Sequence, residues 1–430
     1  DLEKAKSRAV SFFRKLFGTA ALLVIAALGC NGPSSKQFLR LNAVIDPFIA
    51  EGKVPGVVAL ILRDGKPVYE YAAGWADWDA RRPMTMDTIF RVASHTKALT
   101  TVAALMLIEE GKFSPETPVG KFLPNFYYAR VAQPIEGAPP IPDKPGKRPT
   151  KLVRLERHIT IHHLLTHTSG ISYGVHPDIA DDFKKRGFGA FLGHAWYITG
   201  RNDTICEASA KLGRLPLKAQ PGARWIYGYG TDILGCIVEK VSGMPLDEFF
   251  RKRITDRLGM ADTHFYVESR KKERLAVVYD RLKDQNKRSA FQGAYVDTPP
   301  RNLSGGSGLV STAHDYARFL EMIRRGGEYD GERYLKPESI ALMTTNQVGA
   351  RYEGENGGGF GYGFEIAGPK TPEYPQPQGA YGWYGILGTF YRVYPKERLV
   401  IILYTQLFPR DNHLRGRFMS ELADILRKGG

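Results

Sequence analysis

A serine and a lysine three positions apart are the sharpest candidates for chemistry in this sequence. Ser94 and Lys97 lie just before the apolar stretch Ala98–Glu110. This stretch predicts a helix that ends at Gly111. Side chains three residues apart share a helix face, so the Lys97 amine is expected to reach the Ser94 hydroxyl. A neutral, partly buried lysine can accept a hydroxyl proton, and a helix N-terminus favours negative charge. The pair predicts a nucleophilic serine; the alternative is a serine that only caps the helix.

A second serine matches a different nucleophile motif. Gly170, Ser172 and Gly174 fit the G-x-S-x-G pattern of α/β-hydrolases. That turn needs a buried β-strand directly before it, whereas residues 163–169 are typical of a helix end or a loop. We therefore prefer Ser94 as the nucleophile.

A cluster of histidines raises the alternative of a metal site. Its members are His158, His162, His163, His167 and His176. His163 and His167 are four residues apart, but no H-E-x-x-H motif occurs and no third ligand is marked. Packed or hydrogen-bonded histidines are the preferred interpretation, and no metal is expected. No phosphate-binding loop or dinucleotide motif is present, so no organic cofactor is expected. His95 is expected to be exposed beside the nucleophile.

The elements that would position these residues place strands at both ends of the chain and helices in the middle. Two β-hairpins are predicted: Val57–Leu62 with Val68–Ala72 around Asp64-Gly65, and Gly388–Tyr394 with Leu399–Gln406. Further helices are predicted over Phe38–Glu51, Asp232–Val241, Tyr316–Arg325 and Leu414–Lys428, and a long surface loop over Asn125–Thr150. This order predicts an α+β fold in which both ends build one antiparallel sheet beside a helical lobe. The active cleft is expected between the two lobes.

Composition excludes several other classes of protein. The chain is 43% apolar and 24% charged, which are ordinary globular values and exclude extended disorder or a multi-span membrane protein. Lys and Arg number 60 against 45 Asp and Glu, a net charge of +15. The densest basic runs, Lys144–Arg157 and Arg270–Arg288, carry no nucleic-acid-binding motif, so no nucleic acid partner is expected. Solvated loops facing an anionic envelope surface explain the excess better.

The N-terminus predicts export. Its basic residues are Lys4, Lys6, Arg8, Arg14 and Lys15, and the apolar run Leu16–Gly29 follows them. This run is short for a membrane-spanning helix and fits the core of a signal peptide. The sequence before Cys30 resembles a bacterial lipobox, although Ala27 stands where leucine is commoner. Residues 1–30 are therefore interpreted as a lipoprotein-type signal peptide, with Cys30 as the lipidated membrane anchor of a periplasmic or cell-envelope protein. An ordinary secretory signal and a retained anchor are the alternatives.

Export also bears on the two remaining cysteines. An oxidising compartment permits a disulfide between Cys206 and Cys236. Cys236 lies in an apolar helical stretch, however, and two buried free thiols are the preferred interpretation.

Several motifs in a fixed order resemble the serine β-lactamase-like hydrolases, which include class C β-lactamases, D-alanyl-D-alanine carboxypeptidases and family VIII esterases. The resemblance extends from about Phe38 to Ile425. It rests on FRVASHTKALT, ITIHHLLTHTSGISYG, YGYGTDILGCIVEKVSG, RLGMADTHF, GGSGLVSTAHDYARF and the closing hairpin. It implies one β-lactamase/transpeptidase-like catalytic domain over residues 31–430. The sheet lobe would comprise about 37–92 and 300–430, and the helical lobe about 93–299.

The resemblance also implies residue roles. Ser94 is similar to the acylated nucleophile, Lys97 to its base partner, and Tyr227 to the proton-relaying tyrosine of the family's Y-x-N motif. The backbone amides of Ser94 and Ile386 would form the oxyanion hole. Substrate contacts are implied for Tyr229, Trp383, Tyr384 and Gly385.

Two departures from the family pattern bear on the substrate. Tyr229 replaces the asparagine of Y-x-N, and Trp383-x-Gly replaces Lys-Thr-Gly. The first change removes an amide partner, and the second removes a cation that holds a substrate carboxylate. Trp383 resembles the W-x-G of family VIII esterases and would offer an apolar wall to an uncharged group. The sequence therefore predicts an exported serine hydrolase that forms an acyl-enzyme on Ser94 with small ester or amide substrates.

Two alternatives remain at this stage. One is β-lactamase or D-Ala-D-Ala carboxypeptidase activity on β-lactam or cell-wall-like substrates. The other is a non-catalytic binding protein that retains the fold.

Overall fold

The computed structural model describes most of the chain. It covers residues 33–142, 144, 146–189, 201–282, 285–290, 292, 300–352, 354, 357–369 and 376–428. Cys30 and the predicted signal peptide lie outside this range. Among the described residues, no helix combines the length and the apolar composition needed to cross a membrane.

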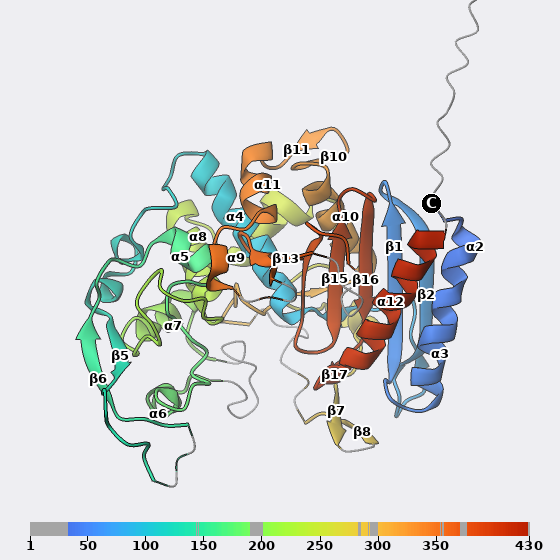
Figure 1. Cartoon of the computed structure of the whole chain (residues 1–430). Coiled ribbons are helices and arrows are strands. Elements are labelled where there is room, and N and C mark those ends of the chain that lie inside the picture. Colours follow the sequence, from blue (N-terminus) through green and yellow to red (C-terminus); the bar gives the residue numbers. More distant parts are fainter. Residues whose placement is uncertain are drawn as a thin grey trace, which may run out of the picture.

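An eight-stranded antiparallel sheet forms one side of the molecule (Figure 1). From edge to edge its strands are β12 (Gly359–Phe360), β13 (Glu365–Ile366), β14 (Tyr381–Tyr384), β15 (Thr389–Tyr394), β16 (Leu399–Tyr404), β1 (Gly56–Arg63), β2 (Lys66–Asp77) and β3 (Arg82–Pro83). The first strand thus pairs with β16, from near the end of the chain. Together with the helices beside it, this sheet confirms the predicted α+β class.

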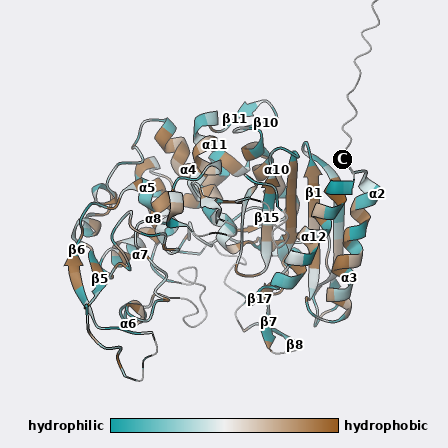
Figure 2. Ribbon diagram, in the orientation of Figure 1, coloured by the Kyte–Doolittle hydropathy of each residue, from teal (hydrophilic) through white to brown (hydrophobic). Residues whose placement is uncertain are grey.

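The middle strands of this sheet are apolar on both faces because both faces are covered. In β1, Val58 and Leu60 enter one hydrophobic cluster, whereas Val57 and Ile61 enter another. The first cluster includes residues of α4 (Thr96–Glu109) and α10 (Ala313–Arg324), and the second includes residues of α2 (Ser35–Phe38), α3 (Asn42–Ala50) and α12 (Asn412–Lys428). Figure 2 shows the same pattern: β1 is mainly hydrophobic, whereas α12 mixes both kinds of residue.

Shorter helices gather on the side of α4 away from the sheet (Figure 1). They are α5 (Ile161–Leu165), α6 (Ala180–Lys185), α7 (Ile205–Leu212), α8 (Gly230–Ser242) and α9 (Leu246–Phe250). Helix α8 packs against both α4 and α7, and Gly243 ends it in the left-handed conformation (φ 72°). Helix α11 (Pro337–Thr344) follows α10 in the chain.

Small sheets complete the described fold. They are β4 (Phe90–Arg91) with β9 (Val310–Ser311), β5 (Arg130–Pro134) with β6 (Thr150–Arg154), β10 (Glu328–Tyr329) with β11 (Glu332–Arg333), and β17 (Leu407–Phe408) with β7 (Tyr279–Leu282) and β8 (Gln285–Arg288).

Local sequence signals predicted most elements correctly and one segment incorrectly. The first hairpin is confirmed, and its turn residues Asp64 and Gly65 have the positive φ angles that a two-residue turn requires (53° and 78°). Residues 125–150 were expected to form one loop, but Arg130–Pro134 within it forms β5, which pairs with β6 at Thr150–Arg154, at and beyond the end of that segment. Their prolines and glycines lie mainly between these strands, and the extended ends find each other as backbone partners. The expected helix over Phe38–Glu51 is interrupted by a 3₁₀ turn at Leu39–Leu41.

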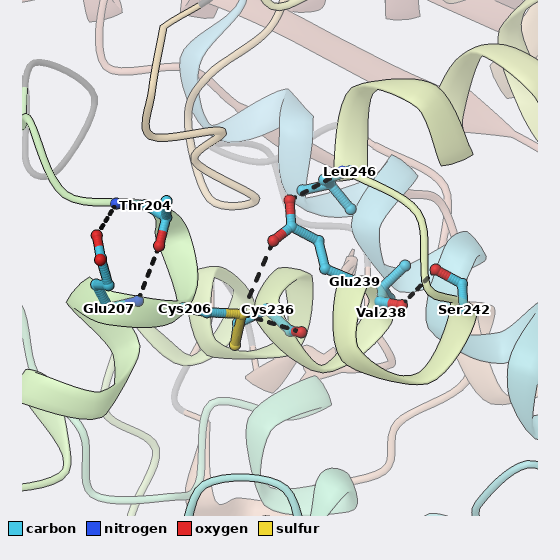
Figure 3. The surroundings of a disulfide bond; sticks show 8 residues. All are labelled: Thr204, Cys206, Glu207, Cys236, Val238, Glu239, Ser242 and Leu246. Atoms are coloured by element: carbon cyan, nitrogen blue, oxygen red, sulfur yellow. Dashed lines mark hydrogen bonds between the residues drawn. A yellow bond between two sulfur atoms is a disulfide. The ribbon is translucent and has the colours of Figure 1, made fainter.

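Cys206 and Cys236 form a disulfide, so the preference for two free thiols is wrong. Helices α7 and α8 pack together, so the two Cα atoms lie 4.9 Å apart. Figure 3 shows the disulfide and the residues around it. The apolar character of α8 predicted burial correctly. It gave no information about α7 as the neighbour that supplies the second sulfur.

Removing this disulfide is expected to destabilise the helical side of the protein. The bond closes a loop of 30 residues, for which the chain-entropy argument gives roughly 3–4 kcal/mol. The double variant Cys206→Ala/Cys236→Ala should therefore unfold at a lower temperature in calorimetry, whereas Cys30→Ala should not. Alkylation of both cysteines without prior reduction, detected by peptide mass spectrometry, would contradict the assignment.

Candidate active site

Ser94 lies in a tight 3₁₀ turn, Ala93–His95, that leads from β4 into α4. The turn begins with Ala93 in the left-handed region (φ 47°), an unfavourable conformation for a residue with a Cβ atom. Pairing of β4 with β9 and the start of α4 hold the turn on both sides. Ser94 as a residue is 9% exposed, so it is nearly buried.

Tyr227 is the residue in contact with the Ser94 hydroxyl. The Ser94 hydroxyl lowers the pKa of the phenol through a side-chain hydrogen-bonding interaction, and Trp383 Nε1 donates a hydrogen bond to Tyr227 Oη over 3.1 Å. The phenol ring is also packed against His167, with ring centroids 4.7 Å apart. A residue from β14 and one from the segment before α8 thus meet beside Ser94.

The Lys97 amine is buried in the same junction, with the residue 2% exposed. It donates hydrogen bonds to Tyr173 Oη (2.9 Å) and to the carbonyl of Gly306 (2.7 Å), and it lies 4.8 Å from the centre of the Tyr227 ring. Within the described residues, no hydrogen bond joins it to Ser94. The expected direct contact is therefore replaced by an arrangement in which Tyr227 stands beside both groups.

A buried carboxylate fixes the loop that receives the amine. Asp232, on α8 and 1% exposed, accepts hydrogen bonds from Ser304 Oγ (2.5 Å) and from the Gly306 amide (3.0 Å). A Cβ atom at Gly306 would lie 2.5 Å from an Asp232 oxygen, so only glycine fits there. The carboxylate thereby orients the carbonyl that binds Lys97.

Burial sets the electrostatics of the site. It lowers the pKa of Lys97 to about 8, and the Asp232 charge offsets part of that effect. Burial also raises the pKa of Tyr227 to about 12, against the hydrogen bonds from Ser94 and Trp383, which lower it. About a tenth of Lys97 is therefore a neutral amine at pH 7 and about half at pH 8, while Tyr227 remains protonated.

The W-x-G segment approaches Ser94 closely through its glycine. A Cβ atom at Gly385 would lie 2.8 Å from the Val92 carbonyl and 2.2 Å from Thr389 Oγ1. In the turn that carries Ser94, the His95 amide donates a hydrogen bond to the Val92 carbonyl. In the turn after β14, the Gly385 amide donates one to the Thr389 carbonyl. The pairing of the Ser94 and Ile386 amides as an oxyanion hole stays a prediction.

Two of the predicted substrate contacts lie differently from expectation. Tyr229 is completely buried among Tyr173, Phe183 and Phe188, and its hydroxyl accepts a hydrogen bond from the Gly189 amide (3.0 Å), so its prediction as a substrate contact is wrong. Trp383 is only 4% exposed and uses its N–H on Tyr227, so it positions that phenol rather than forming a broad apolar wall. Tyr384 is half-buried and stacks on Trp383, with ring centroids 4.8 Å apart.

The prediction that His95 is exposed is also wrong. The residue is fully buried, its Nδ1 lies 3.2 Å from Tyr404 Oη, and its ring packs edge-on against Tyr391. Burial lowers the pKa of this imidazole to about 3, so it is neutral. Side chains at positions 94 and 97 face the site, whereas position 95 points into the sheet-side core.

The rival sites receive no support. Ser172 is completely buried and its hydroxyl accepts a hydrogen bond from the Gly174 amide, which excludes it as an accessible nucleophile. Among the clustered histidines, His162 Nδ1 lies 2.8 Å from Tyr362 Oη, and His163 Nδ1 accepts the Thr160 amide. Over the ranges that the structure covers, no three His, Cys, Asp or Glu side chains are grouped to hold a metal ion.

Sequence reasoning missed the roles of Tyr173, Asp232 and the Gly306 carbonyl. Asp232 carries a signal in hindsight, because a carboxylate inside the apolar stretch of α8 needs buried partners. Tyr173 belongs to the rejected G-x-S-x-G segment, where attention fell on the serine. The Gly306 carbonyl belongs to the backbone, so no residue type in the sequence could have indicated its role.

Comparison with known proteins finds relatives that match most of this chain. The chain matches the family model described as Beta-lactamase over residues 41–424. Esterase EstB of Burkholderia gladioli is 32% identical over 407 residues, covering 90% of this chain and 94% of EstB. Protein Rv1367c of Mycobacterium tuberculosis is 33% identical over 373 residues, covering 83% and 87%. The solved structure of EstCE1, described as a hydrolase with promiscuous acyltransferase activity, has a TM-score of 0.73 at 25% identity, covering 91% of this chain and 99% of EstCE1.

The ionisation of Lys97 generates a pH prediction. Because its pKa is lowered to about 8, the amine is protonated below that pH and neutral above it. The rate at which a fluorophosphonate modifies Ser94 should therefore rise with pH through a midpoint near 8. In Lys97→Ala the rate should fall about 100-fold or more and lose this midpoint. The exposed Lys66→Ala serves as the control; a midpoint that survives in Lys97→Ala would assign the titration to another group.

Proposed function

The chain belongs to the beta-lactamase family and is a serine hydrolase, and from this membership we propose that it cleaves esters of small acyl groups through an acyl-enzyme on Ser94. The observation that carries the proposal is the position of the Tyr227 phenol, which interacts with the Ser94 hydroxyl, is held by Trp383 and has its ring centre 4.8 Å from the buried Lys97 amine. This arrangement supplies a nucleophile and a base in one water-poor junction.

Each step of the proposed reaction moves one proton. In acylation, the Ser94 oxygen attacks the ester carbonyl while its proton passes to the Tyr227–Lys97 pair. The pair then protonates the leaving alcohol oxygen as the ester bond breaks. In deacylation, the pair accepts a proton from water, which attacks the acyl-enzyme, and returns it to Ser94. The amides of Ser94 and Ile386 are assigned to the oxyanion at both stages.

Ester substrates are favoured over peptides because the site lacks the expected amide partner. The asparagine position of Y-x-N is filled by Tyr229, whose buried hydroxyl accepts a hydrogen bond from the Gly189 amide. The similarity to EstB, an esterase, supports the same preference. The printed description of EstCE1 supports acyl transfer to an alcohol as a second outcome of the same acyl-enzyme.

Intact-protein mass spectrometry tests the nucleophile. A fluorophosphonate probe should add one adduct to the wild type and none to Ser94→Ala, and peptide mapping should place it on Ser94. Tyr227→Phe keeps the ring packing and removes the hydroxyl, so turnover of p-nitrophenyl butyrate should fall about 100-fold or more. The absence of an adduct on Ser94 would favour the alternative of a non-catalytic binding protein.

A substrate panel for the same preparations separates the enzymatic alternatives. The ester should react faster than a cephalosporin and a D-Ala-D-Ala peptide. An inert ester together with rapid turnover of the lactam or the peptide would favour the β-lactamase or carboxypeptidase alternative.

We also propose that the protein is exported and anchored to the cell envelope through Cys30. The basic segment, the apolar run Leu16–Gly29 and the lipobox-like sequence support this proposal. Expressed from its full-length gene in a bacterium that modifies lipoproteins, the wild type should incorporate radiolabelled palmitate and enter the detergent phase. Cys30→Ser should do neither, and equal labelling of both proteins would refute the anchor.

A further inference from the structure

An arginine lies beside the site, although the sequence motif has lost its cation. Arg410 follows β17 and precedes α12, and its guanidinium lies 3.9 Å from the centre of the Tyr384 ring. Tyr384 in turn stacks on Trp383, the residue that holds the Tyr227 phenol. A cation–π contact, a ring stack and a hydrogen bond thus connect Arg410 to the Tyr227 hydroxyl beside Ser94.

The guanidinium is oriented but not neutralised. Its Nε donates a hydrogen bond to Asn412 Oδ1 (3.1 Å), and the Tyr384 ring contacts the guanidinium group. Within the described residues, neither an ion pair nor a hydrogen bond engages its two terminal nitrogens. These terminal N–H groups form the fork that binds a carboxylate in a bidentate manner. The residue is half-buried, so solvent and ligands retain access to it.

A second arginine and one carboxylate lie near Tyr384. Arg415 lies on the same side of the sheet, 5.7 Å from the Tyr384 ring. The nearby carboxylate of Glu365 is occupied, since it pairs with Arg392 (2.9 Å) and accepts a hydrogen bond from Tyr352 (2.7 Å). The charge of Arg410 also acts on the site itself, because it lowers the pKa of Tyr227 against the larger effect of burial.

We propose that Arg410 binds a carboxylate on the alcohol portion of the ester, so that the preferred substrates are anionic esters. This inference rests on the proposed function. The alcohol portion is the part of the substrate that Tyr227 must protonate, and Arg410 is joined to Tyr227 through Tyr384 and Trp383. The cation that a Lys-Thr-Gly motif would supply from β14 is thus replaced by one from the segment after β17. The arginine is a specificity-determining residue and takes no part in proton transfer.

A pair of isosteric esters tests this assignment. 4-Acetoxybenzoate carries a carboxylate on its leaving group, and 4-acetoxybenzamide carries a neutral amide of the same size. The corresponding 3-acetoxy pair places the same groups at a shorter distance from the ester. Wild type should show a kcat/KM at least tenfold higher for the acid than for the amide, mainly through KM. Arg410→Ala should lower kcat/KM for the acid by about 10- to 100-fold and leave the amide within about twofold. Arg410→Lys should keep part of the preference because it keeps the charge.

Arg417→Ala is the matched control, since this exposed arginine lies on α12 over Phe48 and away from Tyr384. It should leave both substrates unchanged. The neutral ester reports on the folding of every variant.

Three results would overturn the proposal: an equal kcat/KM of wild type for acid and amide, an unchanged preference in Arg410→Ala, or an equal loss for both substrates in that variant. If wild type cleaves neither ester and Ser94 takes no fluorophosphonate adduct, the proposed function itself fails, and the role of Arg410 fails with it. If wild type and all Arg410 variants cleave the ester of 4-acetoxybenzamide but not that of 4-acetoxybenzoate, the proposed hydrolase is supported and only the carboxylate subsite is refuted.

Discussion

Burial of the Lys97 amine is the constraint on which the rest of the site depends. An ammonium group in a dry environment is unfavourable, and this cost is what makes a neutral base available near pH 8. Helix α4 carries Lys97 between the sheet and the helical side, so water is excluded from both directions. Asp232 and the Gly306 carbonyl make the residual charge tolerable without neutralising it, because the carboxylate acts on the amine through an intervening loop.

The nucleophile and the phenol are held by less regular parts of the chain. The left-handed Ala93 turns Ser94 out of the β4 strand, and Gly385 allows the end of β14 to lie against that turn. Trp383 then reaches Tyr227 from the strand, while His167 supports the ring from the helical side. Three segments that are distant in sequence therefore fix one hydroxyl, and a displacement of any of them would open the contact with Ser94.

The sequence predicted the parts of this structure that depend on local patterns. The hairpin at Asp64-Gly65, helix α4 behind Ser94 and the end of α8 at Gly243 follow from turn chemistry and apolar spacing. Features that depend on distant neighbours were missed: the bond from Cys206 to α8, the inward direction of His95 and the buried hydroxyl of Tyr229. Family resemblance brought Ser94 and Tyr227 together, whereas the position of Arg410 against Tyr384 is visible only in three dimensions.

Direct titration of the Lys97 side chain tests the central claim most closely. Protein labelled with ¹³C at the lysine ε-carbons gives NMR signals that shift on deprotonation, and the Lys97 signal is the one missing from Lys97→Met. The account predicts that this signal titrates near pH 8. Titration at about 10.4, the value of a solvated lysine, would show that the amine is charged throughout the working range and would contradict the account.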